Sequence, residues 1–162
     1  MAKRISLYAA FTALSLGFSY VESFLPLDFI APGIKIGLAN LAPVFLLIRK
    51  DALGAFSVNV ARIMLSSIIF GRLSMVLYSL AGAALSYAVM FVLSKLKIFS
   101  AVGISAAGGA AHNIAQLLVS LLFVPAGVFY YLPVLTAVGT VCGILMGILC
   151  TLVDRRIKTA GT

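Results

Sequence analysis

The side chains of this sequence that could take part in chemistry are few, and most of them interrupt apolar stretches. The candidates for a substrate-binding site are Glu22, Lys35, Asn40, Arg62, His112, Asn113 and Gln116. Charged and amide groups are costly inside hydrocarbon, so each is expected to face a buried partner, a water-filled cavity or a ligand. Lys35 and Arg62 outnumber Glu22, which favours a ligand carrying a carboxylate or a phosphate.

The rest of such a site should be aliphatic and aromatic, with residues such as Tyr20, Phe24 and Tyr78 in the lining. This combination predicts a small amphipathic anion as the ligand. Each polar candidate also has a structural alternative. A buried histidine is often a hydrogen-bonded core residue, amides often join helices, and Arg62 could pair with Glu22. Lys35 either contacts the ligand or anchors its helix at the membrane interface.

We predict no catalytic residue, metal site or cofactor, and therefore no enzymatic activity. The single histidine has no carboxylate at comparable depth, so no Ser/His/Asp arrangement is formed. Cys142 and Cys150 lie eight positions apart, roughly 12 Å along a helix, and cannot form a disulfide with each other. They also lack the ligand spacing of a metal site. No glycine-rich loop followed by Lys-Ser/Thr is present, so ATP would be hydrolysed by a partner.

The composition is that of an integral membrane protein. Of 162 residues, 63% are hydrophobic and 10% are charged, and the mean hydropathy is +1.19. This length allows about six spans of roughly 20 residues, so residues 1–162 are expected to form a single transmembrane domain of the all-α class. The net charge of +8 is assigned to loops and helix ends rather than to nucleic-acid binding.

Apolar runs separated by charges, prolines and glycines predict six membrane-spanning helices. Their ranges are Ile5–Phe24, Pro32–Ile48, Ala52–Phe70, Leu73–Leu93, Phe99–Val124 and Phe129–Leu152. The first is interpreted as a retained helix rather than a cleaved signal, since no small-residue cleavage site follows it. The second is short and contains Gly33, Gly37 and Pro43, which is typical of the broken helices at transporter sites. A kinked helix packed through its glycines is the alternative.

The distribution of cations predicts that both termini face the cytoplasm. The cations expected on the inner side are Lys3, Arg4, Arg49, Lys50, Lys95, Lys97, Arg155, Arg156 and Lys158. Only Lys35 and Arg72 fall on the outer side, and this asymmetry follows the positive-inside rule. The loop 25–31 then faces outward, where it could act as a lid over the site.

Small residues indicate where helices approach closely. The segment 103–111 is almost entirely glycine, alanine and serine, and Gly139, Gly143 and Gly147 recur every four residues in the sixth span. Both patterns are typical of close helix packing in membranes.

Several of these motifs together resemble one bacterial family, labelled Gx transporter or heptaprenyl diphosphate synthase component I. The resemblance depends on Glu22, the run PGIKIGLAN at 32–40, Arg62, Gly103-Ile104-Ser105 and His112-Asn113-x-x-Gln116. It covers nearly the whole chain. That family is similar in turn to the substrate-binding S components of energy-coupling factor (ECF) transporters, which are six-helix membrane proteins.

The resemblance implies an S component in a bacterial cell membrane that captures a vitamin-like, isoprenoid-like or quinone-precursor-like substrate from outside. Its partners would be a transmembrane T component and two ATPase subunits, and Ala9 and Ala13 would supply the Ala-x-x-x-Ala docking pattern of the first helix. A stand-alone transporter is one alternative. A non-catalytic membrane subunit of a prenyl diphosphate synthase complex is another, because Asp28, Asp51 and Asp154 are too isolated to hold Mg²⁺ and diphosphate.

Overall fold

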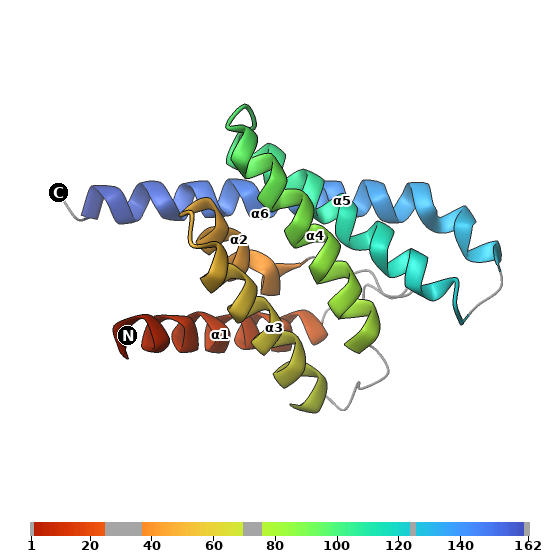
Figure 1. Ribbon diagram of the computed structural model, residues 1–162, viewed down its shortest axis with the longest axis horizontal. Coiled ribbons are helices and arrows are strands. Elements are labelled where there is room, and N and C mark those ends of the chain that lie inside the picture. Colours follow the sequence, from red (N-terminus) through yellow and green to blue (C-terminus); the bar gives the residue numbers. More distant parts are fainter. Residues whose placement is uncertain (1, 25–36, 70–75, 124–125, 161–162) are drawn as a thin grey trace.

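The computed structural model describes residues 2–24, 37–69, 76–123 and 126–160, and within these ranges the regular structure is entirely helical. The helices in chain order are α1 (Ala2–Ser23), η2 (Leu38–Asn40), α2 (Leu41–Ile48), α3 (Ala52–Ile69), α4 (Val76–Leu96), α5 (Ala101–Ser120), η4 (Ala126–Tyr131) and α6 (Leu132–Ala160). The predicted all-α class is therefore confirmed for the described residues. Figure 1 shows the N-terminal end of α1 and the C-terminal end of α6 on the same side of the molecule.

Four of the described helical segments are long and apolar enough to cross a membrane. They are Ala52–Ile69, Val76–Leu96, Ala101–Ser120 and Phe129–Thr159. Helices of this length and composition indicate a membrane-embedded protein. The helix α1 is long enough but less apolar than these four segments, and the segment Leu38–Ile48 is apolar but short. Six spans and their orientation accordingly stay predictions.

The predicted boundaries differ most from the structure in the last helix. The predicted span begins at Phe129, as does the apolar helical segment Phe129–Thr159. Its predicted end at Leu152 was too early, because α6 continues to Ala160. In this continuation, Lys158 forms an ion pair with Asp154 one turn earlier, and such i,i+4 pairs stabilise helix ends.

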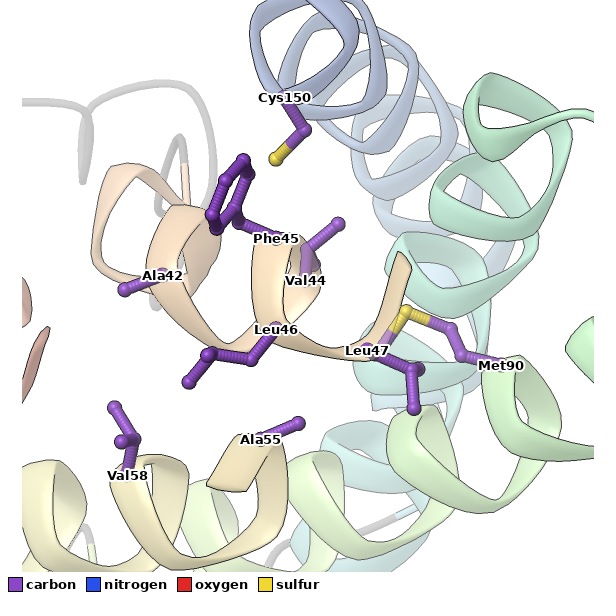
Figure 2. Close-up of a cluster of buried hydrophobic side chains, with 9 residues drawn as sticks. All are labelled: Ala42, Val44, Phe45, Leu46, Leu47, Ala55, Val58, Met90 and Cys150. Atoms are coloured by element: carbon purple, nitrogen blue, oxygen red, sulfur yellow. The ribbon is translucent and has the colours of Figure 1, made fainter. Parts of the chain in front are cut away.

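The short helix α2 occupies the centre of the bundle. Its sequence LAPVFLLI has no polar side chain, and a helix that is apolar all round is stable only when it is covered on every side. Figure 2 shows its side chains among residues from α3, α4 and α6, including Val58, Met90 and Cys150. Pro43 is tolerated because it falls in the first turn, where its missing N–H has no partner within the helix.

The helices α5 and α6 pack through glycines, as their small residues predict. A Cβ atom added to Gly147 would lie 2.7 Å from the Cα of Val102, and one added to Gly143 would collide with the backbone of Ser105. Gly109 and Gly139 face each other in the same way. The two backbones therefore pass in direct contact, which fixes the polar residues of α5 against α6.

Contacts at one end of the bundle join the basic ends of several helices. Arg49 at the end of α2 pairs with Asp154 of α6. The Tyr8 hydroxyl of α1 donates to Asp51 at 2.8 Å, beside the start of α3. The N-terminal part of α1, the α2–α3 junction and the C-terminal part of α6 are thus connected at this end of the bundle.

Candidate functional site

Arg62 is the centre of a polar network within the bundle. Its Nη2 group donates to Asn59 Oδ1 at 2.8 Å and to Asn40 Oδ1 at 3.0 Å. Asn59 precedes Arg62 by three residues, so the two side chains share one face of α3. The Arg62 Nε atom is buried and has no hydrogen-bond partner among the described residues. A guanidinium group in this position crosslinks α3 to the segment before α2.

Asn40 reaches Arg62 because of the turn that precedes it. Gly37 has a φ of +83°, a left-handed conformation that glycine adopts without steric cost. This turn starts η2, and Asn40 is its last residue. The described part of the segment 32–48 is therefore a 3₁₀ turn that continues directly into the eight residues of α2. The predicted interruption of this helix stays a prediction, because residues 32–36 lie outside the described residues.

Glu22 holds the same turn from the other side. Its Oε1 atom accepts a hydrogen bond from the backbone N–H of Gly37. The side chain is buried, with 8% of its surface exposed, and its charge acts on Arg62 without a direct ion pair between the two residues. A carboxylate at a helix N-terminus satisfies an N–H group that the helix leaves open. Glu22 thus ties α1 to the start of η2.

A cavity of about 60 Å³ lies beside this network, between α2, α4, α5 and α6. It is lined by Gly37, Asn40, Pro43, Val44, Asn59, Ala83, Ser86, Met90, Ser105, Gly108, Gly109, His112, Asn113, Gly139, Cys142, Gly143 and Met146. Small-molecule sites usually measure about 300–1,000 Å³, so this space suits a few water molecules in the present conformation. A larger ligand requires the surrounding helices to move apart.

The predicted polar residues of α5 have different positions. His112 and Asn113 both line the cavity, and the His112 ring packs against Gly82 of α4. The Asn113 Nδ2 atom donates to the Leu135 carbonyl at 2.6 Å, so this amide also joins α5 to α6. Gln116 is partly exposed and does not line the cavity.

The structure therefore brings together Asn40, Arg62, His112 and Asn113, with Glu22 behind the Gly37 turn. Lys35 and the proposed lid at 25–31 lie outside the described residues. The predicted aromatic residues do not line this cavity, so their place in a ligand site stays a prediction. Tyr20 and Phe24 are mostly exposed and contact each other edge to face, and neither they nor Tyr78 line the cavity. Ala9 and Ala13 are exposed on α1, which leaves their predicted partner role untested.

Asn59 is the functional candidate that sequence reasoning left out of the site. The i,i+3 spacing of Asn59 and Arg62, which places them on one helical face, was the signal that could have added it. The side-chain oxygens of Asn40 and Asn59 both accept hydrogen bonds from Arg62. Each amide can therefore offer its NH₂ group as a donor to a ligand. Such donors match the oxygen atoms of an anionic or carbonyl-containing ligand.

A protein-family model described as heptaprenyl diphosphate synthase component I matches residues 11–153. The chain belongs to this family. The resemblance seen in the motifs is therefore confirmed, and the match extends across nearly all of the described helices. A search of curated proteins and a search of solved structures found no match. The family description concerns a component of a synthase, which fits a subunit that is not itself the catalyst.

Proposed function

We propose that this chain is a non-catalytic membrane subunit of a prenyl diphosphate synthase complex. The observation that carries the proposal is the family match over residues 11–153, together with four helices of membrane-spanning length and hydropathy. The family description names one component of a synthase. A membrane-embedded component can hold a soluble synthase close to the bilayer that receives its apolar product. Partners are therefore expected at the membrane surface.

The carboxylates of the described residues support the non-catalytic role. Prenyl diphosphate chemistry needs Mg²⁺, a hard cation that takes several carboxylate and water oxygens. Here Glu22 is engaged by Gly37, Asp51 by Tyr8 and Gly54, and Asp154 by Arg49 and Lys158. Each of these groups is used to join segments of the fold. The aspartate-rich catalytic site would accordingly belong to the partner.

The topology that we propose has six crossings in a bacterial cell membrane, with both termini in the cytoplasm. It adds α1 and the segment that ends in α2 to the four helices of spanning character. The gathering of Arg49, the N-terminal part of α1 and the end of α6 at one end supports an inner basic face. A cytoplasmic synthase would dock on that face.

The test is to purify the tagged chain from its native membrane in mild detergent and to assay the eluate for prenyl transfer. With isopentenyl diphosphate and farnesyl diphosphate, we expect chain elongation from the complex and none from the chain expressed alone. Deletion of the gene should lower the cellular content of long-chain prenyl products. If no synthase activity is retained and those products stay unchanged after deletion, the proposal is wrong.

A second candidate is the substrate-binding component of an ECF importer, with a transmembrane T component and two ATPase subunits as partners. The cavity between Asn40, His112 and Asn113, with Arg62 behind it, favours this function. Its size of about 60 Å³ requires the helices to open before a vitamin-sized substrate can bind. A stand-alone transporter would use the same cavity without partners.

Substitutions on α1 test the importer. Ala9→Leu and Ala13→Leu should prevent co-purification of a T component, because both alanines are exposed and a bulky side chain separates packed helices. Ala84→Leu, on an exposed position of α4, is the matched control. Unchanged assembly in the α1 variants would remove this role, and substrate uptake by the chain reconstituted alone would identify a stand-alone transporter.

A further inference from the structure

A second hollow lies at the basic end of the bundle, away from the Arg62 network. This groove has a volume of about 370 Å³, within the range of small-molecule sites. It is lined by Leu47, Ile48, Lys50, Ala52, Phe91, Ser94, Lys95, Lys97, Phe99, Ala101 and Ile104. The end of α2, the start of α3, the end of α4 and the start of α5 all contribute to it. We call it the lysine groove.

The charged residues of the lysine groove are all cations. Lys50, Lys95 and Lys97 are exposed, and no acidic residue is among the described residues that line it. The walls between the lysines are apolar and aromatic, and the Lys95 Nζ atom lies 5.1 Å from the centre of the Phe91 ring. An occupant must therefore combine an anionic part with an apolar part.

The backbone gives independent support for the placement of two of these lysines. Lys50 has a φ of 65° and Lys97 a φ of 57°, and they are the described residues other than glycine with positive φ. Both follow the last turn of a helix, where glycine is the usual residue because the left-handed conformation is unfavourable for side chains. A lysine near the C-terminal end of a helix also interacts favourably with the helix dipole. In α4, Lys95 already has this role in the last turn, so the dipole does not account for Lys97.

We propose that the lysine groove binds a membrane lipid whose apolar chain ends in a phosphate monoester or a diphosphate. Three ammonium groups in one groove match a head group with several negative charges. A terminal phosphate carries about 1.5 to 2 charges at pH 7, and a diphosphate carries more, whereas a phosphodiester lipid carries one. The head contacts Lys50, Lys95 and Lys97, and the first part of the chain lies along Phe91, Phe99 and Ile104. This inference rests on the proposed function for its ligand class, because prenyl diphosphates are the compounds that such a complex handles. Binding to the chain alone requires no partner protein, so it can fail while the proposed function stands.

Binding can be measured on the whole chain in nanodiscs of phosphatidylcholine, with farnesyl diphosphate as the probe. We expect saturable binding that the triple variant K50Q/K95Q/K97Q weakens about tenfold or more, since each exposed charge pair contributes up to about 1 kcal/mol. The matched control K3Q/R4Q/R156Q removes three exposed cations outside the groove and should bind almost normally. An equal loss in both variants would show general electrostatic attraction and would overturn the proposal.

Two further measurements separate the head from the chain. Farnesol, which lacks the charge, and inorganic diphosphate, which lacks the chain, should each bind at least about tenfold more weakly than farnesyl diphosphate. Ala101→Phe fills the apolar wall without removing a lysine, so it should lower binding even if the triple variant fails to fold. Equal binding of farnesol, displacement by phosphatidylglycerol at equal concentration, or full binding by Ala101→Phe would each overturn the proposal.

Discussion

The centre of this bundle and its basic end use positive charge in opposite ways. At the centre, Arg62 is enclosed with Asn40 and Asn59, and both amide oxygens accept hydrogen bonds from it. At the basic end, the lysine groove presents three exposed cations around an apolar hollow that is about six times larger by volume, from about 370 Å³ against about 60 Å³. The central charge is used within the fold, whereas the charges of the groove face outward.

This difference separates stability from ligand binding. A buried donor that has protein acceptors holds helices in place, and removing it leaves those acceptors without a partner. Exposed lysines contribute little to the free energy of folding, so their main effect is expected on the affinity for a ligand. Substitutions at the centre should therefore act first on unfolding, and substitutions in the groove should act first on affinity.

The largest effect is expected for Arg62→Ala. Loss of the guanidinium leaves the buried Asn59 and the half-buried Asn40 without the donor to their oxygens, which should lower the free energy of unfolding by about 3 kcal/mol. Denaturant unfolding of the purified protein in detergent measures this change. Lys50→Ala, at an exposed cation, is the control and should change stability by less than about 0.5 kcal/mol.

A different result for Arg62→Ala would assign the centre to ligand binding. If the variant unfolds like the wild type and yet no longer binds a substrate of the intact protein, Arg62 acts on the ligand rather than on the fold. The comparison between the two regions would then fail, because both would present charge to a ligand.

The second largest effect is expected at the close contact between α5 and α6. In Gly143→Ala the new Cβ would collide with the backbone of Ser105 and Ala106, so α5 and α6 must separate. We expect a loss of about 2 kcal/mol in the free energy of unfolding, as overpacking of a close contact usually causes. The matched control is Gly17→Ala on α1, where nothing lies within 4 Å and the better helix former should be neutral or slightly stabilising. Equal stability of both variants would contradict a rigid contact between α5 and α6.

Much of the helical fold could be predicted, because apolar runs end where charges, prolines or glycines begin. The start of α3 at Ala52 was correct, and its predicted end at Phe70 differs from the described end by one residue. The end of α6 was missed, since it depends on the pairing of Asp154 with Lys158 and Arg49. The apolar run ends at Leu152, and the helix continues beyond it where these ion pairs form.

The candidate site was predictable only where its residues share one element. Arg62 and Asn59 have helical spacing, and so their common face follows from the sequence. The contact between Arg62 and Asn40 depends on the turn at Gly37, whose direction no local pattern specifies. The lysine groove could not be predicted from the sequence, because Lys50 and Lys95 line the same groove only through the packing of four helices.

The third prediction concerns Glu22, which connects the centre to the start of η2. Glu22→Gln keeps an oxygen that can accept from Gly37 but removes the negative charge beside the helix N-terminus and near Arg62. The expected loss in the free energy of unfolding is about 1 kcal/mol. Glu22→Ala removes the acceptor as well and should cost more. If both variants are as stable as the wild type, the carboxylate does not hold the turn and becomes a candidate for direct ligand contact.

The smallest effect has the opposite sign and lies in the lysine groove. Lys97→Gly relieves a φ of 57° after the last turn of α4, and Lys50→Gly relieves a φ of 65° after α2. Each should raise the free energy of unfolding by about 0.5–1 kcal/mol while weakening the binding of farnesyl diphosphate. Lys95→Gly removes the same charge from the last turn of α4, where glycine is unfavourable by about 1 kcal/mol, and should destabilise the protein.

Thermal unfolding and lipid titration of the three variants separate the effect of backbone strain on stability from the effect of charge on binding. Weaker binding in all three, with stability changes of opposite sign, is expected only if the lysines are retained for the ligand. Destabilisation by Lys97→Gly as large as that by Lys95→Gly would instead show that the lysine side chains stabilise the helix ends.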